Sequence, residues 1–121
     1  MTTYTALIVD DEPDIRELLE ITLTRMGITT LTAPDLTSAR KLLEQNATHL
    51  CLTDMNLPDG NGIELVQWIQ KPSPATPVAV ITAYGNMDTA IESLKAGAFD
   101  FVSKPVELPR LRELVNSALK L

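Results

Sequence analysis

Five polar residues in this chain stand within two positions of the end of a short apolar run. Asp10 and Asp11 follow the first run, Asp54 the third, Thr82 the fourth and Lys104 the fifth. Together they supply three carboxylates, one hydroxyl and one ammonium. If they lie close together, such a set can hold a hard divalent cation and handle a phosphoryl group.

Asp54 is the candidate nucleophile of this set. Carboxylates that lie close together raise one another's pKa, so three of them need a compensating cation. The set contains no His or Cys, and oxygen-only ligands favour Mg2+, with Mn2+ as the alternative. Asp54 could then attack a phosphorus centre and form an acyl phosphate. The cation and Lys104 would balance the charge on the phosphoryl oxygens, and Thr82 could donate a hydrogen bond to one of them.

The elements that must position these residues alternate regularly along the chain. Short apolar runs predict strands, and they lie at residues 6–9, 28–31, 50–53, 78–81 and 99–102. Segments of helical period lie between them and after the last; their expected starts are near Pro13, after Asp35, after Asn61, near Asp88 and near Leu108. Five such units predict an α/β fold, a doubly wound five-stranded parallel sheet with five helices on its two faces.

This fold places the polar residues on one rim of the molecule. In open parallel sheets the carboxyl ends of the strands meet at one edge, and ligands bind where the strand order reverses. We therefore expect the residues that follow the strands to lie close together, although they are far apart in sequence.

Composition limits the other functions open to the chain. Its 121 residues are 45% hydrophobic and predict one folded domain over residues 1–121. The net charge of −6 argues against direct binding of nucleic acid. The single cysteine, Cys51, cannot form an internal disulfide, which fits a reducing cytoplasm. With no signal pattern and no apolar run of membrane-spanning length, we expect a cytoplasmic protein without membrane contact.

Four segments of the chain resemble the signature segments of response-regulator receiver domains of bacterial two-component systems. They are residues 8–12 (IVDDE), 52–62 (LTDMNLPDGNG), 81–84 (ITAY) and 104–105 (KP). One such segment is weak evidence, but four of them in order across five β-α units are specific. The resemblance implies the flavodoxin-like strand order 2-1-3-4-5.

The resemblance also implies a role for each polar residue of the rim. Asp54 would be the phosphoacceptor, and Lys104 would be the invariant lysine of the family. Asp11 and Asp54 would bind Mg2+ directly, and Asp10 would bind it through water. The main-chain carbonyl of Asn56 would complete the protein ligands.

Further residues would transmit or tune the signal. Thr82 and Phe101 resemble the switch pair, in which the hydroxyl turns toward the phosphoryl group and the ring follows inward. Asn56 and Tyr84 match positions that set the rate of hydrolysis in the family. The bond from Lys104 to the following proline is usually cis in the family.

By this resemblance the chain is a phosphorelay receiver rather than an enzyme that turns over a separate substrate. It would take a phosphoryl group from a sensor histidine kinase and catalyse its own phosphorylation and dephosphorylation. The surface of the fourth helix, fifth strand and fifth helix would then rearrange. The resemblance also implies that phosphorylation can bring two copies of the domain together as a dimer.

A narrower resemblance concerns the output. Residues 82–101 are similar to receivers of the nitrogen-regulation type, of which type IV pilus regulators are one group. Those receivers precede an ATPase domain that activates sigma-54 polymerase and a DNA-binding domain, so transcriptional activation is implied by analogy. Neither output module is present in this sequence.

Three other functions remain open at this point. A metal-dependent phosphatase with an aspartyl nucleophile would need a second acid where the chain has Asn56. A binding module of the same fold that is not phosphorylated would not need Asp10, Asp11 and Lys104. A flavin-binding domain would need a phosphate-cradling loop after the first strand, where the acids would repel a phosphate.

Several conspicuous residues have a simpler structural explanation. Glu12 suits the first turn of a helix, where the helix dipole favours an acid. Asp59 is expected to serve only the turn that it forms with Gly60. Cys51 is expected in the core, and Trp68 at a partly exposed position.

Overall fold

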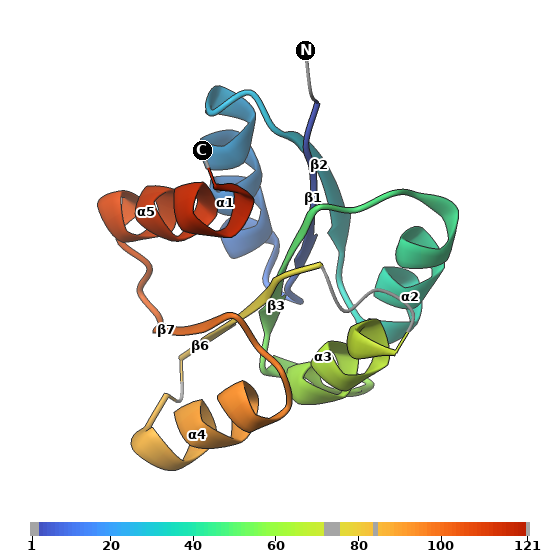
Figure 1. The fold of residues 1–121 in the computed structure, drawn as a ribbon, viewed down its shortest axis with the longest axis vertical. Helices are drawn as coiled ribbons and strands as arrows, with labels where there is room; N and C mark the ends of the chain where they lie inside the picture. The colour runs from blue at the N-terminus through green and yellow to red at the C-terminus, as the bar shows by residue number, and fades with distance from the viewer. Residues whose placement is uncertain (1–2, 72–75, 84, 121) are drawn as a thin grey trace.

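The computed structural model describes residues 3–71, 76–83 and 85–120, and its centre is one parallel sheet between two layers of helices (Figure 1). The strands of the sheet are β1 (Thr5–Val9), β2 (Thr29–Ala33), β3 (Leu50–Asp54), β6 (Val78–Thr82) and β7 (Asp100–Ser103). They are all parallel and lie in the order β2-β1-β3-β6-β7. Because β6 and β7 are the fourth and fifth strands of this sheet, the predicted fold class and the order 2-1-3-4-5 are confirmed.

Helices cover both faces of the sheet. In the described part of the chain they are α1 (Pro13–Arg25), α2 (Leu36–Gln45), α3 (Gly62–Gln70), α4 (Met87–Lys95) and α5 (Leu108–Leu119). Figure 1 shows α1 and α5 on one face, and α2, α3 and α4 on the other. Each face buries its own apolar cluster. No helix among the described residues combines the length and the apolarity that crossing a bilayer would require.

The helices differ in how firmly they are packed against the sheet. α3 buries Ile63, Leu65, Val66 and Ile69 among its residues, whereas α4 buries a single residue, Ser93. The apolar side chains of α4 lie instead largely on the surface. α4 is therefore the least buried of the five described helices that cover the sheet.

The helix starts follow local capping rules. Asp35 accepts a hydrogen bond from the main chain of α2, and Asn61 opens α3 with the predicted capping box. α4 begins slightly earlier than the expected start near Asp88, because Asn86 and Thr89 form a reciprocal capping box. Thr89 occupies the third helical position, where a capping box usually has Glu or Gln, so the sequence pattern does not predict this helix start.

Two further differences from the expected elements concern the ends of strands. β2 begins at Thr29 because Ile28 is buried between α1 and the sheet, and the strand extends until Ala33 pairs with Val9. A short antiparallel hairpin of β4 (Asn56–Leu57) and β5 (Gly60–Asn61) follows Asp54 directly. The sequence predicted only a loop between Asp54 and α3.

Cys51 lies in the middle of β3 and is fully buried, as predicted. Burial raises the pKa of its thiol to about 12, so it is protonated and unreactive at neutral pH. We expect Ellman's reagent to leave the folded protein unlabelled and to detect the one thiol of each chain in concentrated guanidinium chloride. Rapid labelling of the folded protein would show that β3 opens readily.

Candidate functional site: carboxylates around Lys104

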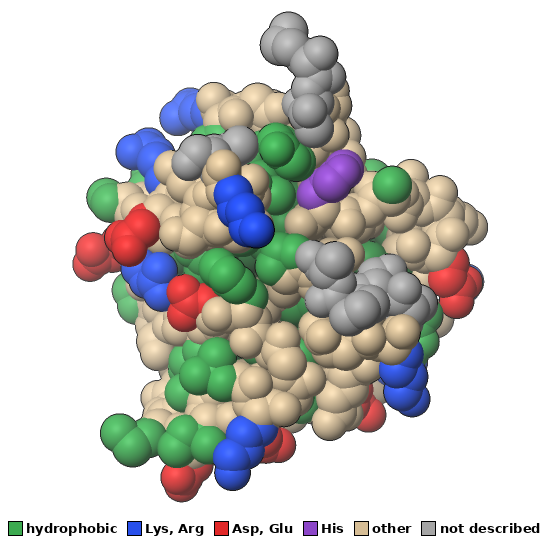
Figure 2. Space-filling model, in the orientation of Figure 1, with side chains coloured by type: hydrophobic (Ala, Val, Ile, Leu, Met, Phe, Trp, Pro, Cys, Tyr) green, Lys and Arg blue, Asp and Glu red, His purple; other side chains and the backbone are tan. Residues whose placement is uncertain are grey.

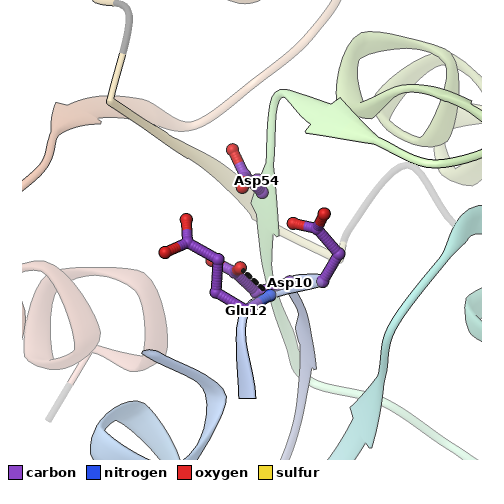
Figure 3. Close-up of side chains that lie close together, drawn as sticks. Asp10, Glu12 and Asp54 are labelled. Carbon is purple, nitrogen blue, oxygen red and sulfur yellow. Dashed lines mark hydrogen bonds between the residues drawn. The ribbon is translucent and has the colours of Figure 1, made fainter. Parts of the chain in front are cut away.

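Four carboxylates gather at the carboxyl ends of β1 and β3. Asp10, Asp11, Glu12 and Asp54 each offer an oxygen, and these oxygens lie within 4.8 Å of one another. Figure 3 shows Asp10 and Glu12 at the end of β1 beside Asp54 at the end of β3. Asp10 and Asp54 are only 2% and 6% exposed, whereas Asp11 and Glu12 are exposed. The cluster therefore has a buried base and a side open to solvent.

The ammonium of Lys104 lies in the middle of these acids. Its Nζ donates to Asp10 Oδ2 at 2.9 Å, to Asp54 Oδ2 at 3.1 Å and to Glu12 Oε1 at 3.1 Å. Lys104 follows β7, and its main-chain N–H donates to the carbonyl of Thr82 at 2.8 Å. The bond from Lys104 to Pro105 is cis, as the family resemblance implies. Residues 94 positions apart are thus joined at one rim of the sheet.

Charge is out of balance in this cluster. Burial raises the pKa of Asp54, and the hydrogen bond and charge of Lys104 offset this only in part. Burial alone would lower the pKa of Lys104, but hydrogen bonds to Asp10, Asp54 and Glu12 outweigh it and raise the pKa above its usual value. Lys104 is therefore a permanent cation, and its single ammonium contacts three of the four carboxylates in the cluster.

Glu12 corrects one sequence-based interpretation. We expected it to serve only the start of α1. It does occupy the N-cap position, but its side chain makes no capping hydrogen bond and contacts Lys104 instead. A third consecutive acid after a buried strand was the available signal.

A cavity of about 240 Å³ opens beside this cluster. It is lined by Asp11, Glu12, Asp54, Asn56, Ala83 and Lys104. Asn56 thus lies at the cavity where a main-chain ligand was expected. A larger cavity, of about 510 Å³, lies elsewhere beside Trp68, and Glu44 is the one charged residue in its described lining. Of these two cavities, the smaller one combines several acids with an ammonium.

The backbone after Asp54 is closely packed. The main-chain N–H of Gly62 donates to the carbonyl of Met55 at 2.7 Å. A Cβ atom on Gly62 would overlap the Asp54 carbonyl oxygen, so only glycine fits at this position. The start of α3 therefore fixes the main chain that carries Asp54.

The residues of the expected switch lie on the neighbouring strands. Thr82 is fully buried at the end of β6. Phe101 on β7 is partly buried and packs against the cluster beneath α2 and α3. Tyr84, the other expected rate-tuning residue, lies outside the described residues.

Comparison with known proteins assigns the chain to a family. Residues 6–116 match the model of the response regulator receiver domain. The chain belongs to this family. As a receiver domain it is not a catalytic enzyme in the usual sense.

Relatives of this receiver domain include regulators of the nitrogen-regulation type, as the sequence predicted. It is 64% identical over 121 residues to the response regulator protein PilR of Pseudomonas aeruginosa, covering all of this chain and 27% of PilR. It is 33% identical to the beryllofluoride-activated NtrC4 receiver domain dimer, with a TM-score of 0.92 and 96% of each chain covered. For the receiver domain of NtrX from Brucella abortus the identity is 37% and the TM-score 0.89, with 95% and 98% covered. The chain spans about a quarter of the length of PilR.

The donor set of this receiver domain suits a hard divalent cation. Its ligand atoms are carboxylate oxygens, and the negative charge that Lys104 leaves uncompensated favours a further cation. The partly open cavity leaves room for water ligands, which Mg2+ retains when it binds to proteins.

Proposed function

We propose that the receiver domain accepts a phosphoryl group on Asp54 from a sensor histidine kinase, with Mg2+ bound beside it. The main support is the position of Asp54, whose buried carboxylate lies 3.1 Å from the Lys104 ammonium at an acidic cavity. An oxygen nucleophile and a fixed cation thus stand together where a phosphoryl group can enter.

For the ligands of the cation we propose the set that the family resemblance implies. Asp11, Asp54 and the main-chain carbonyl of Asn56 would hold Mg2+ directly, and Asp10 would act through water. Glu12 lies close enough to contribute. When bound, the ion supplies positive charge that balances the phosphoryl oxygens and favours ionised Asp54.

The residues of the chain then carry out the transfer. An Asp54 oxygen attacks the phosphorus of the phosphohistidine in line, the new O–P bond forms, and the P–N bond breaks to release the imidazole. Lys104 is already charged and can move its hydrogen bond from Asp54 to a phosphoryl oxygen. The domain thereby promotes its own phosphorylation and the later hydrolysis of the aspartyl phosphate, and Asn56 and Tyr84 would set the rate of that hydrolysis.

The same change would reach the output surface. Thr82 would turn its hydroxyl toward the phosphoryl group and Phe101 would follow, altering the face formed by α4, β7 and α5. Figure 2 shows hydrophobic side chains gathered where α4 lies, and Met87, Ile91 and Leu94 are 77%, 44% and 50% exposed. A shift between two conformations that differ by a few kcal/mol is sufficient.

This face would control output modules that follow the receiver. We propose residues 1–121 as one receiver domain of a longer cytoplasmic regulator, with ATPase and DNA-binding domains that activate transcription with sigma-54 polymerase. Similarity to PilR and the receiver of NtrX supports this class, and a type IV pilus regulator is the member that we favour. A phosphorylation-dependent dimer through the exposed face of α4 is part of the proposal.

Labelling by acetyl phosphate tests the proposal. With Mg2+ we expect intact-mass spectrometry to find one phosphoryl group for each chain, and with EDTA none, because the phosphoryl charge is then unbalanced. Sustained turnover of a phosphate ester would favour the phosphatase alternative instead. A protein that responds to neither Mg2+ nor beryllofluoride would be a binding module that is not phosphorylated.

A further inference from the structure

We infer that Asp59 is a positioning residue for the cation site, because its carboxylate fastens the β4–β5 hairpin to the start of α2. The hairpin carries Asn56, whose main-chain carbonyl is a proposed ligand of Mg2+. This inference rests on the proposed function, since it concerns the same cation.

The carboxylate of Asp59 bonds to a different element of the chain. Its Oδ1 accepts from the main-chain N–H of Leu36 at 2.8 Å. Its Oδ2 accepts from the main-chain N–H of Thr37 at 3.0 Å and from the Thr37 hydroxyl at 2.8 Å. The expectation that Asp59 serves only its own turn was therefore wrong. The three bonds are named here the Asp59 clasp.

The clasp complements the anchors within the hairpin's own segment. At its far end Asn61 pairs with Asn56 and caps α3, which ties one strand of the hairpin to that helix. Leu57 is buried in the same apolar cluster as Leu36. The clasp adds a polar tie to α2, so the turn is held between two helices rather than at one end.

Holding the hairpin in advance favours binding of the cation. Asn56 is exposed, and its main-chain N–H is 3.4 Å from Asp54 Oδ1, a long hydrogen bond. Without the clasp, the hairpin would keep only its anchors at Asn61 and Leu57 and would be more mobile. Cation binding would then have to restrict this added motion, and the entropy loss would weaken binding. Asp59 stays charged in this role, because hydrogen bonds from Leu36 and Thr37 keep its pKa below 3.8.

The chain provides a matched control for this residue. Asp35 also accepts a hydrogen bond at the start of α2, from the main-chain N–H of Ser38 at 2.7 Å. Asp35→Ala and Asp59→Ala each remove one carboxylate from the same helix terminus. Both are expected to lower the melting temperature, but only Asp59→Ala removes the bonds between the hairpin and α2.

The measured quantity is Mg2+ affinity, from isothermal titration and from the rise in melting temperature with Mg2+ concentration. We expect Asp59→Ala to weaken binding about tenfold, the lower end of the losses seen when outer-shell partners of metal ligands are removed. Asp35→Ala should bind as the wild type does. Thr37→Val removes one bond of the clasp and should give a smaller loss, and it serves as the test if Asp59→Ala does not fold.

Three outcomes would contradict the inference. Equal affinities of wild type, Asp59→Ala and Thr37→Val would overturn it and leave the proposed function standing. Equal losses in Asp35→Ala and Asp59→Ala would assign the effect to helix stability or charge rather than to the clasp. A wild-type domain that binds no Mg2+ would overturn the proposed function and this inference together.

Discussion

Replacing Asp54 with Asn is expected to abolish labelling of the domain by acetyl phosphate in the presence of Mg2+. The amide has nearly the same shape, but it lacks the anionic oxygen that, on the proposed function, would attack phosphorus and bind the cation. Intact-mass spectrometry after incubation should find no phosphorylated chain. Stoichiometric labelling of this variant would place the acceptor at another residue.

Asp14→Asn provides the control for this substitution. Asp14 is an exposed acid in the first turn of α1, close in sequence to the cluster but not among its four carboxylates. The same chemical change there should leave labelling at the wild-type level. Loss of labelling in both variants would indicate that general negative charge, rather than Asp54 itself, is required.

The Asp54 variant should also be more stable than the wild type in EDTA. Burial raises the folded-state pKa of Asp54, so the folded protein binds more protons than the unfolded chain from about pH 3.8 upward to that raised pKa. Protonated Asp54 therefore contributes stability below this window, and this contribution is lost as pH rises through it. Asp54→Asn lacks this loss, and its melting temperature at neutral pH should be higher.

The second large effect is expected from Lys104→Met. The Lys104 side chain is 9% exposed and pairs with Asp10 and Asp54 side chains that are 2% and 7% exposed. Removing the ammonium leaves these buried carboxylates without a cationic partner, a change that costs about 3 kcal/mol. Urea denaturation in EDTA should show this loss, and labelling by acetyl phosphate should slow on the order of a hundredfold.

Two comparisons make this result specific. Lys95→Met changes an exposed lysine in the last turn of α4 and should alter neither quantity. Mg2+ should restore much of the stability of Lys104→Met, because a divalent ion can compensate the same acids. Unchanged stability of Lys104→Met in EDTA would mean that the carboxylates do not depend on this ammonium.

The sequence predicted the sheet and the polar residues at its carboxyl edge, because both follow from local patterns. Buried strands read as apolar runs, and the residue that ends a run in a parallel sheet is carried to a common edge. The proximity of Asp10, Asp54 and Lys104 can therefore be predicted without knowing which atoms they contact. The caps at Asp35 and Asn61 were likewise readable from a few neighbouring residues.

Contacts between distant segments were not readable in this way. The Asp59 clasp joins residues 22 and 23 positions apart, and nothing in the turn sequence indicates that the carboxylate reaches another helix. Glu12 sits where a helix favours an acid, so only the position of Lys104 shows where its side chain points. Side-chain direction depends on tertiary neighbours, and a one-dimensional pattern does not contain them.

The shallow burial of α4 affects how far a small local signal can travel. Because α4 buries only Ser93, it would lose little packing energy if it slid or tilted. To make the same movement, α3 would have to remove several large side chains from the core. A single phosphoryl group on the rim would form only a few new hydrogen bonds, so the free energy available to move a helix is small. On the proposed function, α4 is thus the helix that phosphorylation would displace most easily, while the other helices would hold the acids in place.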